Sequence, residues 1–123
     1  MSLLSGGFIS GNKLVLEDYL ISLPKYISSR VENNQQVTLG MRQEAVHISA
    51  EAASANEAQL PAEVESFESD FVHRTQTVHL RTGHWNYSGL ASLDMQFRMG
   101  QRVHAQLDPE QLYFFDMNSG LRL

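Results

Sequence analysis

The strongest constraint on the fold is a succession of short segments in which apolar and polar residues alternate, separated by glycine, asparagine and proline. Alternation with a period of two is typical of strands that bury one face. Roughly eight to ten such segments can be distinguished, at the spacing expected of a small sandwich or barrel. The sequence shows no convincing amphipathic helix and no internal repeat. It therefore predicts an all-β fold that is closed or nearly closed.

The beginning of the chain predicts a hairpin. Residues 6–16 read as two short strands around a turn at Gly11-Asn12. These glycines lack the Gly-Lys-Ser/Thr ending of a phosphate loop, so the hairpin is the better interpretation. Residues 1–4 lack the basic and apolar regions of a signal peptide. We set them aside as a cloning leader or linker and expect residues 5–123 to form a single domain.

Composition and charge exclude several classes of function. The chain has no cysteine and a net charge of −5, and residues 43–73 contain seven acidic residues but no lysine or arginine. Thiolate zinc sites and disulfides are therefore excluded, and this balance argues against binding a nucleic-acid backbone. No apolar run approaches the roughly 20 residues of a membrane span, so direct membrane insertion is not expected. The stretch 51–59 lacks an apolar stripe, and we expect an exposed loop there.

The last 23 residues carry the most specific pattern. Val103 and Ala105 alternate with polar neighbours, as in a half-buried strand. Asp108 is suited to cap one helical turn, and Pro109 suits its first position. An aromatic strand follows at residues 112–115.

A turn and a final short strand complete this terminal pattern. Asp116 begins the turn, and Gly120 is able to supply a positive φ. Leu121 and Leu123 then alternate, and we expect them to form a closing strand.

This terminal pattern resembles the end of the C-terminal regulatory domain of sugar-import ABC transporter ATP-binding subunits, of the maltose/sn-glycerol-3-phosphate importer type. The matching positions are Gly100, Val103, Leu107, Pro109, Glu110, Leu112, Phe115, Asp116, Ser119, Gly120, Arg122 and Leu123. A second segment, Val37–Val46, resembles the family's Leu-Gly-Ile-Arg-Pro-Glu-His-Val motif but departs from it at Gln43 and Ala45. Two ordered motifs at a suitable separation make the resemblance fairly specific.

The resemblance implies a fold and a role. The fold would be a small OB-type (TOBE-like) β-barrel with additional strands and one or two short helical turns. The role would be regulation and dimer stabilisation in a carbohydrate importer, with no enzyme activity or cofactor in this chain. ATP and Mg²⁺ would belong to an ATPase domain outside this sequence. The implied partners are a second copy, the transporter membrane subunits through that ATPase domain, and in some members a regulatory protein. The implied location is the cytoplasmic face of the cell membrane.

Eight residues form the structural motif by this resemblance: Gly40, Arg42, Glu44, Asp108, Pro109, Phe115, Asp116 and Gly120. In an extended segment, Arg42 and Glu44 would point the same way. They would then either pair or each tie down a neighbouring loop, which favours a structural clamp over a ligand contact.

Three aromatic residues are candidates for a partner contact. Trp85 and Tyr87 lie in a segment bounded by Gly83 and Gly89, which we interpret as a loop. Aromatic loops are frequent at interfaces, but such a loop equally suits a plug for the open end of its own barrel. Tyr113 alternates with buried positions in the aromatic strand. If both faces of this strand are buried, one of them must be covered by a second sheet layer or by another subunit.

The remaining chemistry is sparse. The five histidines lack metal-ligand spacing, and neither a nucleophile elbow nor a paired acid and base is present. Two alternatives to the importer role remain. One is a barrel that senses a small ligand or oxyanion, and the other is a nucleic-acid-binding OB module, which would need stacking aromatics beside cations.

Overall fold

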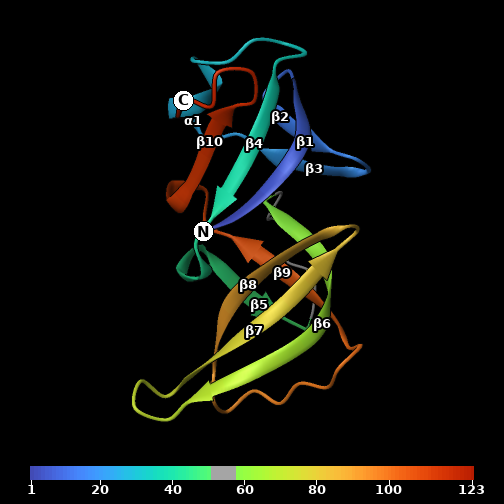
Figure 1. Cartoon of the computed structure of the whole chain (residues 1–123), viewed down its shortest axis with the longest axis vertical. Helices are drawn as coiled ribbons and strands as arrows, with labels where there is room; N and C mark the ends of the chain where they lie inside the picture. The colour runs from blue at the N-terminus through green and yellow to red at the C-terminus, as the bar shows by residue number, and fades with distance from the viewer. Residues whose placement is uncertain (51–57) are drawn as a thin grey trace.

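The computed structural model describes residues 1–50 and 58–123, and its strands form two packed assemblies (Figure 1). A five-stranded sheet has the order β10-β4-β1-β2-β3, and a closed barrel has the order β5-β8-β7-β6-β9. The sheet strands are β1 (Ser2–Ser10), β2 (Lys13–Leu16), β3 (Tyr19–Ser22), β4 (Gln36–Met41) and β10 (Leu112–Asp116). The barrel strands are β5 (Val46–Ser49), β6 (Gln59–Asp70), β7 (Thr75–Thr82), β8 (Trp85–Ser92) and β9 (Arg102–Leu107).

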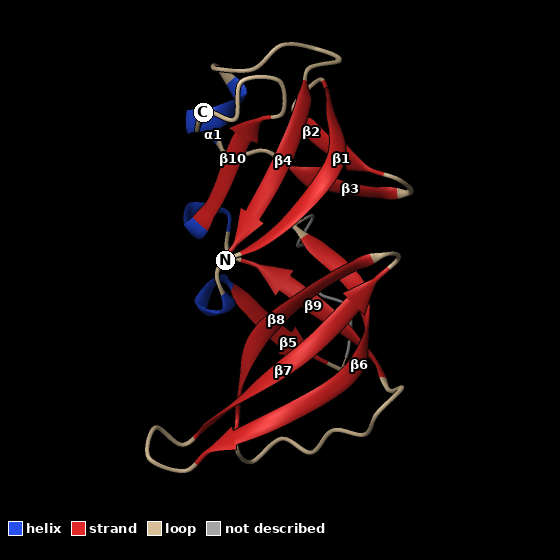
Figure 2. Ribbon diagram, in the orientation of Figure 1, coloured by secondary structure: helices blue, strands red, loops and turns tan. Residues whose placement is uncertain are grey.

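Helical structure in the described residues is confined to short turns, as Figure 2 shows. They are the helix α1 (Lys25–Ser28) and the 3-10 turns η1 (Gln43–Ala45) and η2 (Pro109–Gln111). The all-β, OB-type barrel with additional strands is therefore confirmed. In this part of the chain, no helix is long and apolar enough to cross a membrane.

The two assemblies repeat one pattern of strand pairing. In the sheet, β1, β2 and β3 form a meander, β4 pairs with β1, and β10 pairs with β4. In the barrel, β6, β7 and β8 form a meander, β9 pairs with β6, and β5 pairs with β9. The barrel closes because β5 also pairs in parallel with β8. The pattern of strand pairing is repeated, but the residues are not, so the repeat is not visible in the sequence.

The final strand of each pattern comes from the other half of the chain. After β4 the chain leaves the sheet through η1 and supplies β5 to the barrel. After β9 it leaves the barrel through η2 and supplies β10 to the sheet. The two crossings touch, since the Asp108 backbone N–H donates a hydrogen bond of 2.9 Å to the carbonyl oxygen of Ala45. This exchange ties the sheet and the barrel together.

Alternation along the strands builds a continuous core. On β7, Gln76, Val78 and Leu80 are buried, whereas His79 lies partly exposed on the outer face. The cluster of buried apolar residues extends from Leu4 in the sheet to Leu107 in the barrel. Gln76 is tolerated inside because its side-chain amide donates to the carbonyl oxygens of Ser92 and Met95, at 2.8 and 2.7 Å.

The beginning of the chain differs in part from the expectation. The hairpin at residues 6–16 is confirmed, with Ser10 opposite Lys13 across the turn. Residues 2–4, which we set aside as a leader, instead belong to β1 and pair with β4. Leu4 is fully buried. Leu4 contributes to the core because its pairing with Leu39 of β4 turns its side chain to the buried face of the sheet.

The segment around Trp85 also differs from the expectation. We interpreted residues 82–89 as a loop, but only the turn at Gly83-His84 connects two strands there. Trp85 and Tyr87 lie on β8, because they alternate with exposed Asn86 in a tightly paired hairpin. The strand β8 continues from there to Ser92.

The terminal segment follows most of the predicted order. The strand at Val103, the capped turn at Asp108 and the aromatic strand are confirmed as β9, η2 and β10. The prediction of a closing strand at Leu121 and Leu123 was wrong, because this segment forms only an isolated bridge between Phe115 and Arg122. The expected loop at 51–59 lies mostly outside the described residues, and Gln59 already begins β6.

Candidate functional site

A cleft of about 520 Å³ lies between the sheet and the barrel. Tyr19 lines it from β3 of the sheet. The other side is formed by β6, β7 and β9 of the barrel, which contribute Glu63, Arg81, Arg102 and His104. Two of the nine lysine and arginine residues of an acidic chain therefore meet in this cleft.

The strand register explains why these side chains meet. Glu63 lies directly opposite Arg81 on one side and Arg102 on the other. All three alternate with buried residues, so they project from the outer face of the barrel. The row of cation, carboxylate and cation places opposite charges on neighbouring strands, an arrangement that stabilises a sheet modestly.

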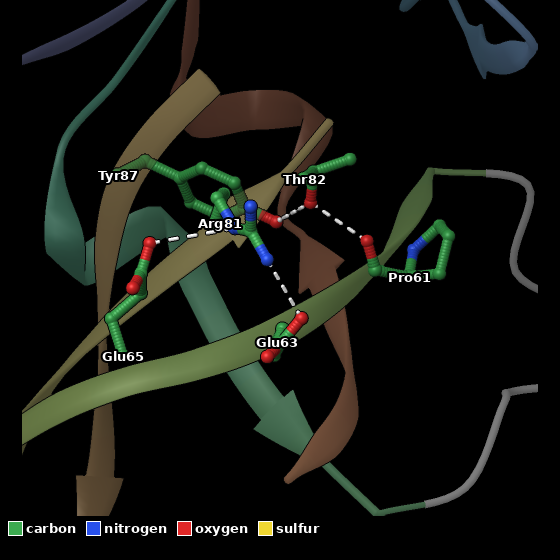
Figure 3. A network of polar contacts seen from close by, with 6 residues as sticks. All are labelled: Pro61, Glu63, Glu65, Arg81, Thr82 and Tyr87. Atoms are coloured by element: carbon green, nitrogen blue, oxygen red, sulfur yellow. Dashed lines mark hydrogen bonds and ion pairs between the residues drawn. The ribbon is translucent and has the colours of Figure 1, made fainter. Parts of the chain in front are cut away.

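Arg81 forms ion pairs with Glu63 of this row and with Glu65 (Figure 3). Its Nη2 lies 2.9 Å from Oε2 of Glu63, and its Nε lies 3.5 Å from Oε1 of Glu65. Among the described residues, Arg102 forms no ion pair, although Glu63 is its neighbour across the strands. Arg102 therefore retains its guanidinium donors for a ligand in the cleft.

A buried hydroxyl pair lies behind this row. The Thr82 Oγ1 lies 2.7 Å from the Tyr87 hydroxyl and 2.7 Å from the carbonyl oxygen of Pro61, to which it donates (Figure 3). Burial raises the pKa of the Tyr87 hydroxyl to about 12, and the hydrogen bond with Thr82 opposes this only in part. These contacts fix β6, β7 and β8 beneath the cleft.

Two contacts hold the sheet beside the barrel. The indole N–H of Trp85 donates to the carbonyl oxygen of Ser5 at 3.0 Å. The Nδ1 of His84 lies 2.9 Å from the Glu17 carboxylate, so the β7–β8 turn touches the β2–β3 turn. The cleft is therefore bounded by elements whose relative position is set by specific contacts.

The predicted motif residues form a second cluster, at the crossings between the assemblies. Gly40 lies opposite Tyr113 across the β4–β10 pair. A Cβ at Gly40 would lie 2.9 Å from the Phe115 ring and 2.7 Å from the Met1 sulfur. Glycine is therefore required at this position by the close approach of its neighbours.

Arg42 and Glu44 do not form the expected extended pair. The chain turns into η1 at Gln43, so the two side chains are not on one strand. Instead, Arg42 lies over the Tyr113 ring at 5.8 Å and Arg122 lies over it at 4.5 Å. The two sequence motifs are thereby joined through Tyr113, at cation–π distances.

The turn residues adopt the predicted local geometry. The Asp108 carboxylate accepts a hydrogen bond from the Glu110 backbone N–H, and Pro109 occupies the first position of η2. Gly120 has φ = +73°, which favours glycine. Hydrogen bonds from Ser119 and Gln35 hold the pKa of the Asp116 carboxyl below its usual value.

The three candidate partner residues lie in different environments. Trp85 and Tyr87 are only 5% and 4% exposed, so they fill the interior of this chain. Tyr113 is half-buried on the outer face of the sheet. A partner contact of these residues stays a prediction, and Tyr113 is the one that remains accessible to it.

The histidines are dispersed. His73 lies 2.8 Å from Asp70 and His79 lies 3.7 Å from Glu68, both on the exposed β6–β7 hairpin. In residues 1–50 and 58–123, no group of three metal-ligating side chains is found.

The cleft residues were missed by the sequence analysis. Arg81, Arg102 and His104 each alternate with buried residues, and this signal identifies them as outward-facing strand positions. Their convergence depends on which strands are neighbours, and the sequence does not specify that pairing.

The fold of the whole chain is similar to that of a solved structure. The chain is similar to the cytoplasmic molybdate-binding protein ModG, in a crystal form with molybdate bound, at a TM-score of 0.61 and 12% identity. The match covers 92% of this chain and 88% of the ModG chain. The likeness therefore concerns the fold and includes both assemblies. The sequence matches no family model and no curated protein.

Proposed function

We propose that this chain is the regulatory, dimer-stabilising domain of the ATP-binding subunit of a carbohydrate ABC importer. One observation carries the proposal: the two sequence motifs are the two crossings by which the sheet and the barrel exchange strands. They are some 60 positions apart in the sequence, yet β4 and β10 pair along their length. Residues resembling one family's landmarks thus meet at the structural centre of the domain.

The outer face of the sheet supports a second copy as partner. Phe8, Val15 and Leu20 are neighbours across β1, β2 and β3, and Leu20 is 56% exposed. Leu3 continues this apolar sheet face toward Tyr113. Contiguous exposed apolar side chains are typical of interaction surfaces. A twofold contact through this face would be self-complementary.

The same proposal assigns different roles to this chain and to the ATPase domain. ATP and Mg²⁺ would bind an ATPase domain outside this sequence, and this chain would have no enzyme activity. Contact with the transporter membrane subunits would run through that ATPase domain, at the cytoplasmic face of the membrane. A regulatory protein would be an additional partner.

The encoding reading frame tests the importer assignment. We expect a phosphate loop, a Leu-Ser-Gly-Gly-Gln signature and an Asp-Glu pair upstream of the region that encodes Ser5. A complete frame without any ATPase module would refute the assignment.

Sedimentation equilibrium tests the dimer. The protein should sediment as a dimer, and Leu20→Glu should shift it to a monomer by placing a charge in the apolar sheet face. Phe71→Glu is the matched control, since Phe71 is 79% exposed but lies at the tip of the β6–β7 hairpin, away from the sheet (Figure 1). A monomeric parent protein, or a dimer unaffected by Leu20→Glu, would contradict this part of the proposal.

A second candidate function is the binding of an inorganic oxyanion. The observation that favours it is the likeness in fold to a molybdate-binding protein. Calorimetric titration with molybdate and sulfate would test it directly. Heat changes that saturate at one or more sites are expected for an oxyanion sensor, and no saturable heat would exclude this role.

A further inference from the structure

We propose that the cleft between the sheet and the barrel binds a small phosphorylated metabolite, with Arg102 and His104 holding the phosphate. This site is independent of the importer assignment, because it rests only on the side chains that line the cleft. Of the residues that match the two family motifs, Val103 alone lines the cleft.

The size of the cleft favours an organic ligand. Its volume of about 520 Å³ lies within the range of roughly 300–1,000 Å³ found for metabolite and drug-sized ligands. A lone inorganic oxyanion would leave most of this space to water. The ligand should therefore carry an organic body as well as an anionic group.

The charged end of the site lies on β9. Arg102 and His104 are two residues apart on one strand and so project from the same face. Glu63, the carboxylate nearest in register to Arg102, is bound by Arg81. Arg102 can therefore offer paired N–H donors, the arrangement that recognises phosphate most strongly.

The other end suits hydroxyl groups. One oxygen of Glu63 is held at 2.9 Å by Arg81, and the carboxylate keeps further acceptor capacity for ligand hydroxyls. Tyr19 contributes an aromatic side chain from the sheet side. A sugar phosphate combines these requirements, since it joins a phosphate to a polyhydroxylated body.

Such a ligand would touch both assemblies at once. Tyr19 belongs to the sheet, whereas Arg102 and Glu63 belong to the barrel. Binding would add a contact to the Trp85–Ser5 link and so stabilise one relative position of the two assemblies.

Calorimetric titration of the full chain tests the proposal with four probes: glucose 6-phosphate, ribose 5-phosphate, glucose and inorganic phosphate. At least one of the two sugar phosphates should bind, and glucose and inorganic phosphate should bind about tenfold more weakly or not at all. Arg102→Gln should weaken sugar-phosphate binding by about tenfold or more, because charge-assisted hydrogen bonds are lost.

Arg98→Gln is the matched control, since Arg98 is an exposed arginine outside the cleft lining. This variant should bind the sugar phosphate as the parent protein does. If Arg102→Gln fails to fold by circular dichroism, His104→Gln tests the same end of the site. Absence of binding by both sugar phosphates would overturn the proposal. Equal affinity for inorganic phosphate, or equal loss in Arg98→Gln, would also overturn it.

Discussion

The indole N–H of Trp85 donates a hydrogen bond to the carbonyl oxygen of Ser5, across 80 residues of sequence and from the barrel to the sheet. Trp85 is 5% exposed, so the hydrogen bond forms at the edge of the buried core. The strand exchange already prevents the two assemblies from separating without unfolding. The Trp85–Ser5 contact adds the directional constraint that sets how they face each other across the cleft.

Replacing Trp85 by Phe should lower the free energy of unfolding by about 1–3 kcal/mol, because the variant loses this hydrogen bond and leaves part of the indole volume unfilled. Urea denaturation followed by circular dichroism measures the change. Ser5→Ala is the control and should be close to neutral, since the main-chain carbonyl accepts the bond. A neutral Trp85→Phe variant would show that the contact contributes nothing to stability.

The Tyr87 hydroxyl should make the fold sensitive to alkaline pH. Its pKa rises from the ordinary 10.0 to about 12 in the folded chain. The unfolded state therefore loses its proton first, so this contribution to stability is complete below pH 10 and disappears as the pH rises through about 12. The contribution is about 2–3 kcal/mol.

Thermal melting between neutral and alkaline pH checks this prediction. The parent protein should lose stability more steeply above pH 10 than Tyr87→Phe, which has no phenol to ionise at this position. Parallel pH profiles for the two proteins would show that Tyr87 titrates normally.

Gly40→Ala should destabilise the sheet by about 1–3 kcal/mol, the range for overpacked interiors. The added Cβ would lie 2.9 Å from the Phe115 ring and 3.3 Å from the Tyr113 Cβ, so β10 would have to shift. Phe115→Leu in the same chain should recover part of the loss by making room. Equilibrium unfolding of the two single variants and the double variant measures the coupling. Strictly additive effects would place the strain elsewhere.

Gly120→Val should cost about 1–2 kcal/mol for a different reason, since the added side chain meets no neighbouring atom within 4 Å. The cost comes from φ = +73°, which a β-branched residue adopts poorly. The distortion should also weaken the hydrogen bond from the Leu123 backbone N–H to the Phe114 carbonyl oxygen. Thermal melting with sedimentation measures both stability and assembly. Gly120→Asn should cost less, and equal losses would argue against a backbone origin.

Local rules recovered much of the terminal segment. The Asp108 cap, Pro109 at the start of its turn and the positive φ of Gly120 were predicted from single residues, because each depends on hydrogen bonds or torsions within a few positions. The same rules failed at Trp85. Flanking glycines suggested a loop, whereas pairing with β7 across the turn made it a strand.

The candidate site could not be predicted from the sequence. Alternation is a signal that identifies Arg81 and Arg102 as outward-facing, but it gives no reason to place them beside the same Glu63. Their convergence follows from the order of strands around the barrel.

The sequence by itself therefore determined an all-β fold that is closed or nearly closed, with the turns at Asp108 and Gly120, since these depend on local periodicity and backbone preference. The OB-type barrel and the two motifs followed from the resemblance to a family. Only the tertiary structure decided that the final strands are exchanged, that Arg42 and Arg122 both lie over the Tyr113 ring, and that a cleft opens beside Arg102. The physical reason is that strand pairing is a contact between distant segments. The backbone N–H and C=O groups of a strand require a neighbouring strand, and the packing of the whole chain selects which strand that is.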